Sequence, residues 1–191
     1  MKNYQITAWC HHWICEHVKE GDLCIDATAG NGNDTQLLCE LVGEEGKVLA
    51  FDIQSQAVES TKKRLEAKGL LQRANVYLES HTRMDAYAKE DSVSCIVFNF
   101  GYLPGGDHAL ATQKDTSIAA VKAGLRLLKK GGIMSLCIYS GGDSGFEERD
   151  ALLEELRTLD GKQYLVIVSS YYNRPNNPPI PVLIVKLGGN E

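Results

Sequence analysis

Short hydrophobic runs alternate along the chain with longer segments whose apolar residues recur at helical spacing. The short runs predict strands and the longer segments predict helices. We expect strands over 23–26, 48–52, 74–78, 93–98, 133–139, 163–170 and 181–187. We expect helices over 4–19, 34–42, 55–68, 112–129 and 145–158. This alternation implies an α/β fold: a mostly parallel sheet with helices on both faces, and an antiparallel strand at one edge from the closing pair.

Composition bounds the class of protein. The chain has 191 residues, of which 43% are hydrophobic, and this suits a single domain over 1–191. No apolar run is long enough to span a bilayer and no signal-peptide pattern precedes the first helix, so we expect a cytoplasmic protein without a membrane partner. The net charge of −5 argues against a broad nucleic-acid-binding surface but leaves room for a local one.

The cysteines and histidines of the first helix do not have the spacing of a metal site. The chain has six cysteines and no C-x-x-C pair, so we expect neither a disulfide framework nor a zinc centre. The same helix carries Ile6, Trp9 and Trp13 on one face, and we expect its tryptophans to pack over the ligand-binding end of the sheet.

A glycine turn separates the first strand from the next helix. It reads Asp26-Ala-Thr-Ala-Gly30-Asn31-Gly32-Asn-Asp34, and Asp52 closes the following strand. The glycines let the backbone turn sharply and let a ligand lie against it. An acid at the end of the second strand can accept hydrogen bonds from ribose hydroxyls. The segment therefore predicts a nucleoside-binding βαβ unit.

The residues around the glycines discriminate between nucleosides. A dinucleotide needs Gly-x-Gly-x-x-Gly, but the third glycine is missing here, and Asp34 would place a carboxylate where the pyrophosphate docks. Acids on both sides of the glycines suit S-adenosylmethionine (SAM), which carries an ammonium and a sulfonium. The pattern resembles motif I of the class I methyltransferases; the alternative is a tight turn in which Asp34 caps the helix. The expected cofactor-binding residues are Asp26, Gly30, Asn31, Gly32, Asp34 and Thr35 at the methionine end, Asp52 and Gln54 at the ribose, and Ser80 and His81 at the adenine.

A second group of candidate residues follows the fourth strand. Asn99-x-x-Tyr102 loosely resembles the (Asp/Asn)-Pro-Pro-(Tyr/Phe) motif of amine N-methyltransferases. A carboxamide oxygen can accept the hydrogens of an amine and aim its lone pair, and an aromatic ring can stack on a flat base. Asp107 and His108 are candidates to remove a proton. The alternative is a glycine-rich surface loop whose asparagine caps a turn.

Two basic runs lie on predicted helices. They are Lys62-Lys63-Arg64 and the group Lys122, Arg126, Lys129 and Lys130. Such runs are usually solvated faces, and a contact with tRNA phosphates is the alternative.

Several blocks together resemble one bacterial family. They are Asp26-Ala-Thr-x-Gly-Asn-Gly-x-Asp-Thr35, Ala50-Phe-Asp-Ile-Gln54, Phe98-Asn-x-Gly-Tyr-Leu-Pro-Gly-Gly-Asp107 and Asn173-x-x-Asn-x-Pro-Pro179. The family was formerly labelled rRNA methylase and is associated with methylating 5-aminomethyl-(2-thio)uridine at the tRNA wobble position. The resemblance implies a seven-stranded Rossmann-like sheet, SAM as cofactor, tRNA rather than rRNA as partner, and a homodimer.

The chain departs from this family after the fifth predicted strand. A typical member is expected to have Tyr-His-Gly-His there, whereas this chain has Tyr139-Ser140-Gly141-Gly142. If those histidines bind RNA or move a proton, other groups must do so here. A small-molecule methyltransferase on the same fold, or a catalytically silent RNA- or nucleoside-binding module, are the rival interpretations.

Overall fold

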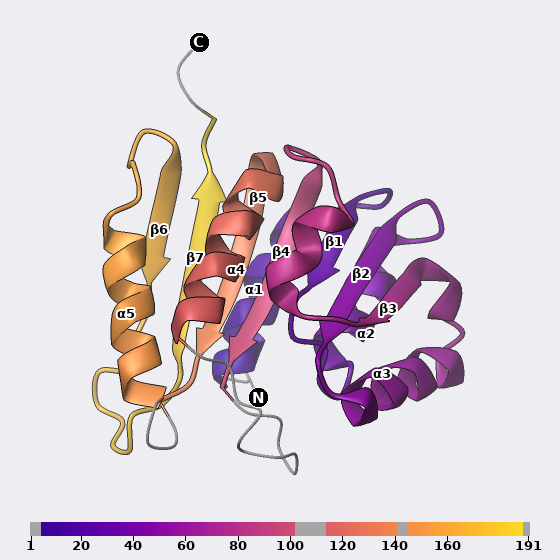
Figure 1. Ribbon diagram of the computed structural model, residues 1–191, viewed down its shortest axis with the longest axis horizontal. Coiled ribbons are helices and arrows are strands. Elements are labelled where there is room, and N and C mark those ends of the chain that lie inside the picture. Colours follow the sequence, from indigo (N-terminus) through magenta and orange to yellow (C-terminus); the bar gives the residue numbers. More distant parts are fainter. Residues whose placement is uncertain (1–4, 102–113, 141–144, 189–191) are drawn as a thin grey trace.

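The computed structural model describes residues 5–101, 114–140 and 145–188. In this part of the chain a seven-stranded sheet has the order β3-β2-β1-β4-β5-β7-β6. Helices cover both faces (Figure 1). Strand β7 runs antiparallel to both β5 and β6, and the other pairs are parallel. The predicted fold class is confirmed, with the antiparallel strand inserted between β5 and β6.

The strands are β1 Leu23–Asp26, β2 Lys47–Asp52, β3 Ala74–Leu78, β4 Val93–Phe100, β5 Leu128–Ile138, β6 Tyr164–Val168 and β7 Ile180–Lys186. The helices are α1 Ile6–His17, α2 Asn33–Val42, α3 Ser55–Ala67, α4 Lys114–Leu127 and α5 Gly145–Arg157, with short 3₁₀ helices η1 Leu71–Arg73 and η2 His81–Ala86. Each strand and each α-helix agrees in type with its prediction, and most ends agree within two residues; no prediction covers η1 or η2.

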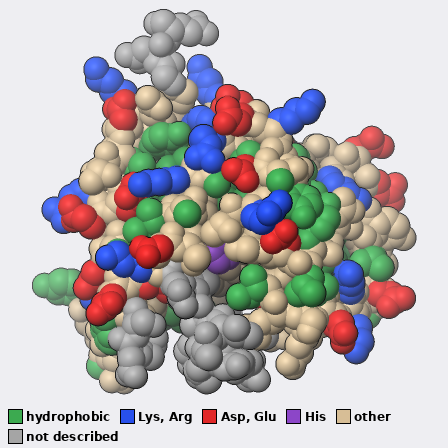
Figure 2. Space-filling view, viewed as in Figure 1, with side chains coloured by type: hydrophobic (Ala, Val, Ile, Leu, Met, Phe, Trp, Pro, Cys, Tyr) green, Lys and Arg blue, Asp and Glu red, His purple; other side chains and the backbone are tan. Residues whose placement is uncertain are grey.

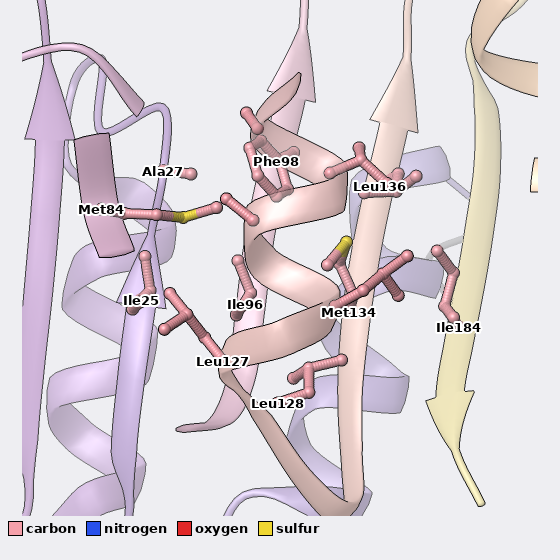
Figure 3. Close-up of a cluster of buried hydrophobic side chains, with 14 of the residues drawn as sticks. Ile25, Ala27, Met84, Ile96, Phe98, Leu127, Leu128, Met134, Leu136 and Ile184 are labelled. Carbon is pink, nitrogen blue, oxygen red and sulfur yellow. The ribbon is translucent and has the colours of Figure 1, made fainter. Parts of the chain in front are cut away.

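The sheet is buried on both faces because the central strands are apolar at nearly every position. Side chains alternate between the two faces of a strand, so on β1 Cys24 joins one core and Ile25 the other. Helices α1, α2 and α3 contribute Ile14, Leu38 and Leu65 to the first core. The second core lies under η2, α4 and α5 (Figure 3).

The junction between α4 and β5 differs from the prediction. The apolar spacing predicts a helix to residue 129, and the sequence there reads Lys129-Lys130-Gly131-Gly132, a pattern typical of a helix end. Instead α4 ends at Leu127, and Leu128 already pairs with Val93 of β4. The register of this pair of strands then shifts, and Gly131 adopts a φ of +77°. Because sheet pairing begins before the glycines, they form an irregularity within the strand rather than a helix cap.

The buried face of α1 also differs from the prediction. Ile6, Cys10 and Ile14 are buried, whereas Trp9 is 42% exposed. Residues four apart lie on one helix face, so these three form the stripe that packs on the sheet. The expected packing of tryptophans over the sheet is wrong for Trp9, which stacks on Trp13 at the edge of that stripe.

Two further properties follow from the described residues. No helix in these ranges has the length and apolar character that crossing a lipid bilayer needs. All six cysteines lie in the described ranges and are free thiols.

Candidate cofactor and acceptor site

The turn between β1 and α2 requires glycine at its last position. Gly30 and Gly32 have φ values of +54° and +75°, a region that side chains disfavour. A Cβ on Gly32 would also lie 2.9 Å from Cα of Thr61 on α3. Backbone strain and crowding therefore both exclude other residues at Gly32.

Helix α3 fixes the outer side of this turn. The hydroxyl of Thr61 donates to the carbonyl oxygen of Gly30 at 3.1 Å, and Nε of Arg64 donates to the carbonyl oxygen of Asn31 at 2.6 Å. This role was not predictable from the sequence, in which Arg64 is only one member of a basic run. Two carbonyls of the turn are thus held before any ligand arrives.

Asp52 holds the inner side of the turn. Its Oδ2 accepts from the backbone N–H of Gly30 at 2.9 Å, and its Oδ1 accepts from the backbone N–H of Gln54 at 2.9 Å. Each carboxylate oxygen has a second lone pair, so both can also accept a hydroxyl hydrogen. Gln54 bonds to Asp52 through its backbone, where it forms the N-cap of α3.

Asp26 lies fully buried beneath the turn. Its carboxylate accepts from the Thr35 hydroxyl at 2.6 Å and from the backbone N–H of Thr28 at 3.2 Å. Burial, and then the negative charge of Asp34, raise the pKa of Asp26 to about 7. Near neutral pH its ionised form is therefore readily stabilised by a cation placed beside it.

Asp34 joins the turn to two other elements. Its Oδ1 lies 2.6 Å from Nε2 of His11 on α1, and its Oδ2 accepts from Nδ2 of Asn99 at 2.7 Å. The backbone N–H of Asn99 donates to the Thr28 hydroxyl at 2.7 Å. The predicted cofactor turn and the predicted acceptor residue are thus in direct contact, and His11 is a site residue that sequence reasoning missed.

The other predicted acceptor residues cannot be placed. Tyr102, Asp107 and His108 lie outside the described residues, as does Gly142. Ser140 follows the end of β5 and is buried, and its hydroxyl has no hydrogen-bond partner within the described part of the chain. It is a buried polar group at a position where the family resemblance predicted a histidine.

Ser80 and His81 lie at the start of η2, after β3. Ser80 caps this helix by accepting the backbone N–H of Thr82 at 3.3 Å. His81 is 9% exposed and its ring meets Phe98 edge-on. Burial lowers the pKa of His81 to about 4, so its ring is neutral at pH 7. Its Nε2 has no hydrogen-bond partner in the described ranges, which is costly for a buried polar atom unless a ligand supplies one.

Several cations of the two basic runs form ion pairs with acidic residues of the protein. The ion pairs are Lys122 with Glu155, Arg126 with Asp85 and Glu90, and Lys129 with Asp22. Figure 2 shows Lys and Arg side chains interspersed with Asp and Glu over this face, without a large basic block. Lys62 and Lys63 are exposed on α3. The solvated-face interpretation fits these helices better than a broad RNA-binding surface.

Comparison with known proteins agrees with this fold. A family model described as "Putative rRNA methylase" matches residues 48–185. The chloroplastic tRNA (mnm(5)s(2)U34)-methyltransferase of Arabidopsis thaliana is 38% identical in an alignment of 177 residues that covers 87% of this chain. The chain spans 65% of the length of that relative.

Two solved structures are similar over nearly the whole chain. The "putative rRNA-methylase" from Clostridium thermocellum is 42% identical and has a TM-score of 0.94; the match covers 97% of this chain and 100% of that one. A "putative methyltransferase" from Streptococcus mutans, solved in complex with SAH (S-adenosylhomocysteine), is 33% identical with a TM-score of 0.88 and the same coverage of both chains.

The strand order, the glycine turn and these structural neighbours define the Rossmann-like class I methyltransferase fold. Within that class, the chain belongs to the family described as "Putative rRNA methylase".

Proposed function

We propose that this protein is a SAM-dependent methyltransferase that N-methylates the aminomethyl group of 5-aminomethyl-(2-thio)uridine at the tRNA wobble position. One observation carries the proposal: Asp34 of the glycine turn bonds to Asn99 at 2.7 Å. This contact supports the proposal because it joins the glycine turn, the proposed cofactor site, to a carboxamide suited to an amine acceptor. The Arabidopsis relative is named a tRNA (mnm(5)s(2)U34)-methyltransferase, and the Streptococcus mutans structure is a complex with SAH.

The cofactor assignment follows the geometry of the turn. Asp52 would accept the ribose hydroxyls through the lone pairs that Gly30 and Gln54 leave open. The backbone of Gly30, Asn31 and Gly32 would let the cofactor lie close against the turn. The Thr35 hydroxyl donates a hydrogen bond to Asp26. Asp26 and Asp34 supply negative charge for the ammonium and the sulfonium. Ser80 and His81 would border the adenine, whose nitrogens can bond to the unpaired Nε2.

The reaction requires a neutral amine in line with the sulfonium methyl group. The amine lone pair forms the new N–C bond, the S–C bond breaks with its electron pair moving to sulfur, and the product ammonium loses a proton. Asn99 would accept an amine hydrogen and aim the lone pair, and Tyr102 would stack on the base. Asp107 or His108 would accept the proton. A free aliphatic amine titrates near 10, like lysine, so turnover should rise with pH through neutrality.

The organisation of the protein belongs to the same proposal. We infer one methyltransferase domain over 1–191, a cytoplasmic location, where tRNA is available, and a homodimer. The edge strand β6 supports the dimer because Leu165, Ile167 and Val168 are each more than 40% exposed, and an exposed apolar edge strand favours pairing with another surface. Sedimentation of the purified chain would measure this state.

Isotope transfer tests the activity. Purified protein would be incubated with methyl-labelled SAM and with tRNA carrying the unmethylated aminomethyl nucleoside, ribosomal RNA or a metabolite extract, and digested nucleosides would be identified by mass spectrometry. The proposal predicts label on the wobble aminomethyl nitrogen alone. Label only in the metabolite fraction would favour the small-molecule rival, which the ion-paired cations of α4 favour. SAM binding without transfer to any fraction would indicate a silent binding module.

A further inference from the structure

The first helix reaches the candidate site through a histidine. His11 lies on α1, and its Nε2 approaches Oδ1 of Asp34, the first acid of α2, at 2.6 Å. The two side chains are 35% and 16% exposed. The buried stripe of α1 is formed by Ile6, Cys10 and Ile14, and His11 lies beside this stripe rather than in it. The hydrogen bond to Asp34 joins its ring to α2.

The chemistry of the carboxylate fixes the orientation of both partners. An ionised carboxylate only accepts hydrogen bonds, so His11 must carry a hydrogen on Nε2. For the same reason the Asn99 amide must turn its nitrogen toward Asp34, with Nδ2 at 2.7 Å from Oδ2. The amide oxygen then points away from Asp34. The backbone of Asn99 is held separately, by the Thr28 hydroxyl at 2.7 Å.

We propose that His11 is a positioning residue for methyl transfer: it holds Asp34 so that the Asn99 carboxamide presents its oxygen, not its nitrogen, to the acceptor amine. The inference rests on the proposed function and adds to it a residue from outside the motif that predicted the site. An amide turned the other way would offer donors to an amine that also carries hydrogens. The lone pair of the acceptor amine would then accept a hydrogen bond from the amide and would no longer point at the methyl group.

This role separates catalysis from cofactor binding. Removing His11 leaves Oδ1 of Asp34 without its partner but keeps the negative charge that Asp34 supplies to the proposed cofactor. Affinity for SAM should therefore stay the same or rise, whereas turnover should fall because Asp34, no longer held by His11, positions the Asn99 amide less precisely. A merely structural residue would weaken both together.

Three variants test the inference. His11→Leu should lower kcat on the order of 10- to 100-fold, since small misplacements of reacting groups cost about that much. Its Kd for SAM, measured by calorimetry, should not increase beyond about threefold, within the tolerance of such comparisons. His11→Gln places an amide N–H near the position of Nε2 and should recover most of the turnover. His12→Leu is the control, because His12 is exposed on the same helix and should change neither quantity.

A spectroscopic measurement keeps the inference separate from the proposed function. The side-chain NH₂ resonances of Asn99, assigned by NMR through their loss in Asn99→Ala, should shift in His11→Leu and return toward the native position in His11→Gln. Unchanged resonances, or equal losses of kcat and SAM affinity, would overturn the positioning role. The Asn99 resonances could shift in His11→Leu while the wild-type protein methylates no RNA. That pair of results would overturn the proposed function but would still confirm that His11 orients the Asn99 amide through Asp34.

Discussion

The glycine turn after β1 and the short helix η2 after β3 both lie at the carboxyl edge of the sheet, but their polar atoms are paired differently. Around the turn, Asp26, Asp34 and Asp52 each accept two hydrogen bonds from named partners. In η2, Nε2 of His81 is buried without a partner in the described ranges. The polar atoms of the turn are thus already hydrogen-bonded, whereas on the proposed function the cofactor would supply the partner that Nε2 of His81 lacks.

This contrast has an energetic meaning. A preorganised set of hydrogen bonds loses little freedom when a ligand binds, and its contribution to affinity is retained. A buried, unpaired nitrogen destabilises the free protein and regains that free energy on binding. The turn should therefore dominate affinity for SAM, and His81 should link affinity to the stability of the free protein.

The largest effect should come from Asp52. Asp52→Ala removes the bonds to Gly30 and Gln54 as well as the acceptors for the ribose. We expect SAM affinity to fall by about 2–3 kcal/mol, since hydrogen bonds to a charged group contribute about 1.5–3 kcal/mol. Calorimetry would measure it, and Asp52→Asn, which keeps one acceptor, should lose less. Unchanged affinity in Asp52→Ala would remove Asp52 from the cofactor site.

A glycine pair tests whether the turn depends on its backbone. Gly32 and Gly69 have similar φ values of +75° and +68°, but only Gly32 would place a Cβ against Thr61, whereas nothing lies within 4 Å at Gly69. Gly69→Ala should lower the free energy of unfolding by about 1–2 kcal/mol from φ strain alone. Gly32→Ala should cost at least about 1 kcal/mol more from crowding. Urea denaturation measures both; equal losses would contradict the close approach of α3.

Asp26 should make cofactor binding depend on pH. Its pKa is raised to about 7 from 3.8, so below pH 7 it is mostly protonated, and a bound cation must displace that proton. Affinity for SAM should therefore rise roughly eightfold between about pH 6 and pH 7.5, and then level off. Calorimetry across this range measures the rise, and Asp26→Asn should flatten it. A steep rise that persists in Asp26→Asn would assign the titration to another group.

The smallest effect should come from His81. His81→Phe keeps a ring against Phe98 but removes the unpaired nitrogen. The free protein should unfold at the same or a higher denaturant concentration, while affinity for adenosine should fall by about 1 kcal/mol, the usual net contribution of one hydrogen bond. Unchanged adenosine affinity would mean that the ligand forms no hydrogen bond with Nε2 of His81.

Much of this arrangement was predictable from the chain. The alternation of apolar runs and amphipathic segments gives the strands and helices because buried parallel strands and their covering helices have different periods. The glycine turn and Asp52 were identifiable because their chemistry is encoded by neighbouring residues. The α4–β5 junction was not, since pairing of Leu128 with β4 overrides the local helix-end pattern.

The hydrogen bonds between distant elements could not be predicted from the sequence. His11 and Asp34 are 23 residues apart, and Arg64 and Asn31 are 33 apart. No periodicity relates such positions, because the packing of α1 and α3 on the sheet brings them together. The same packing exposes Trp9, for which the apolar face of the first helix had suggested burial.

A crystal of this protein grown with S-adenosylhomocysteine tests the central claim most directly. The account predicts the ribose hydroxyls on Asp52, the methionine end along Gly30–Gly32, the adenine beside His81 with a hydrogen bond to its Nε2, and the sulfur directed toward Asn99. A ligand bound elsewhere, or a turn that stays empty at saturating concentration and instead accepts NAD, would contradict it.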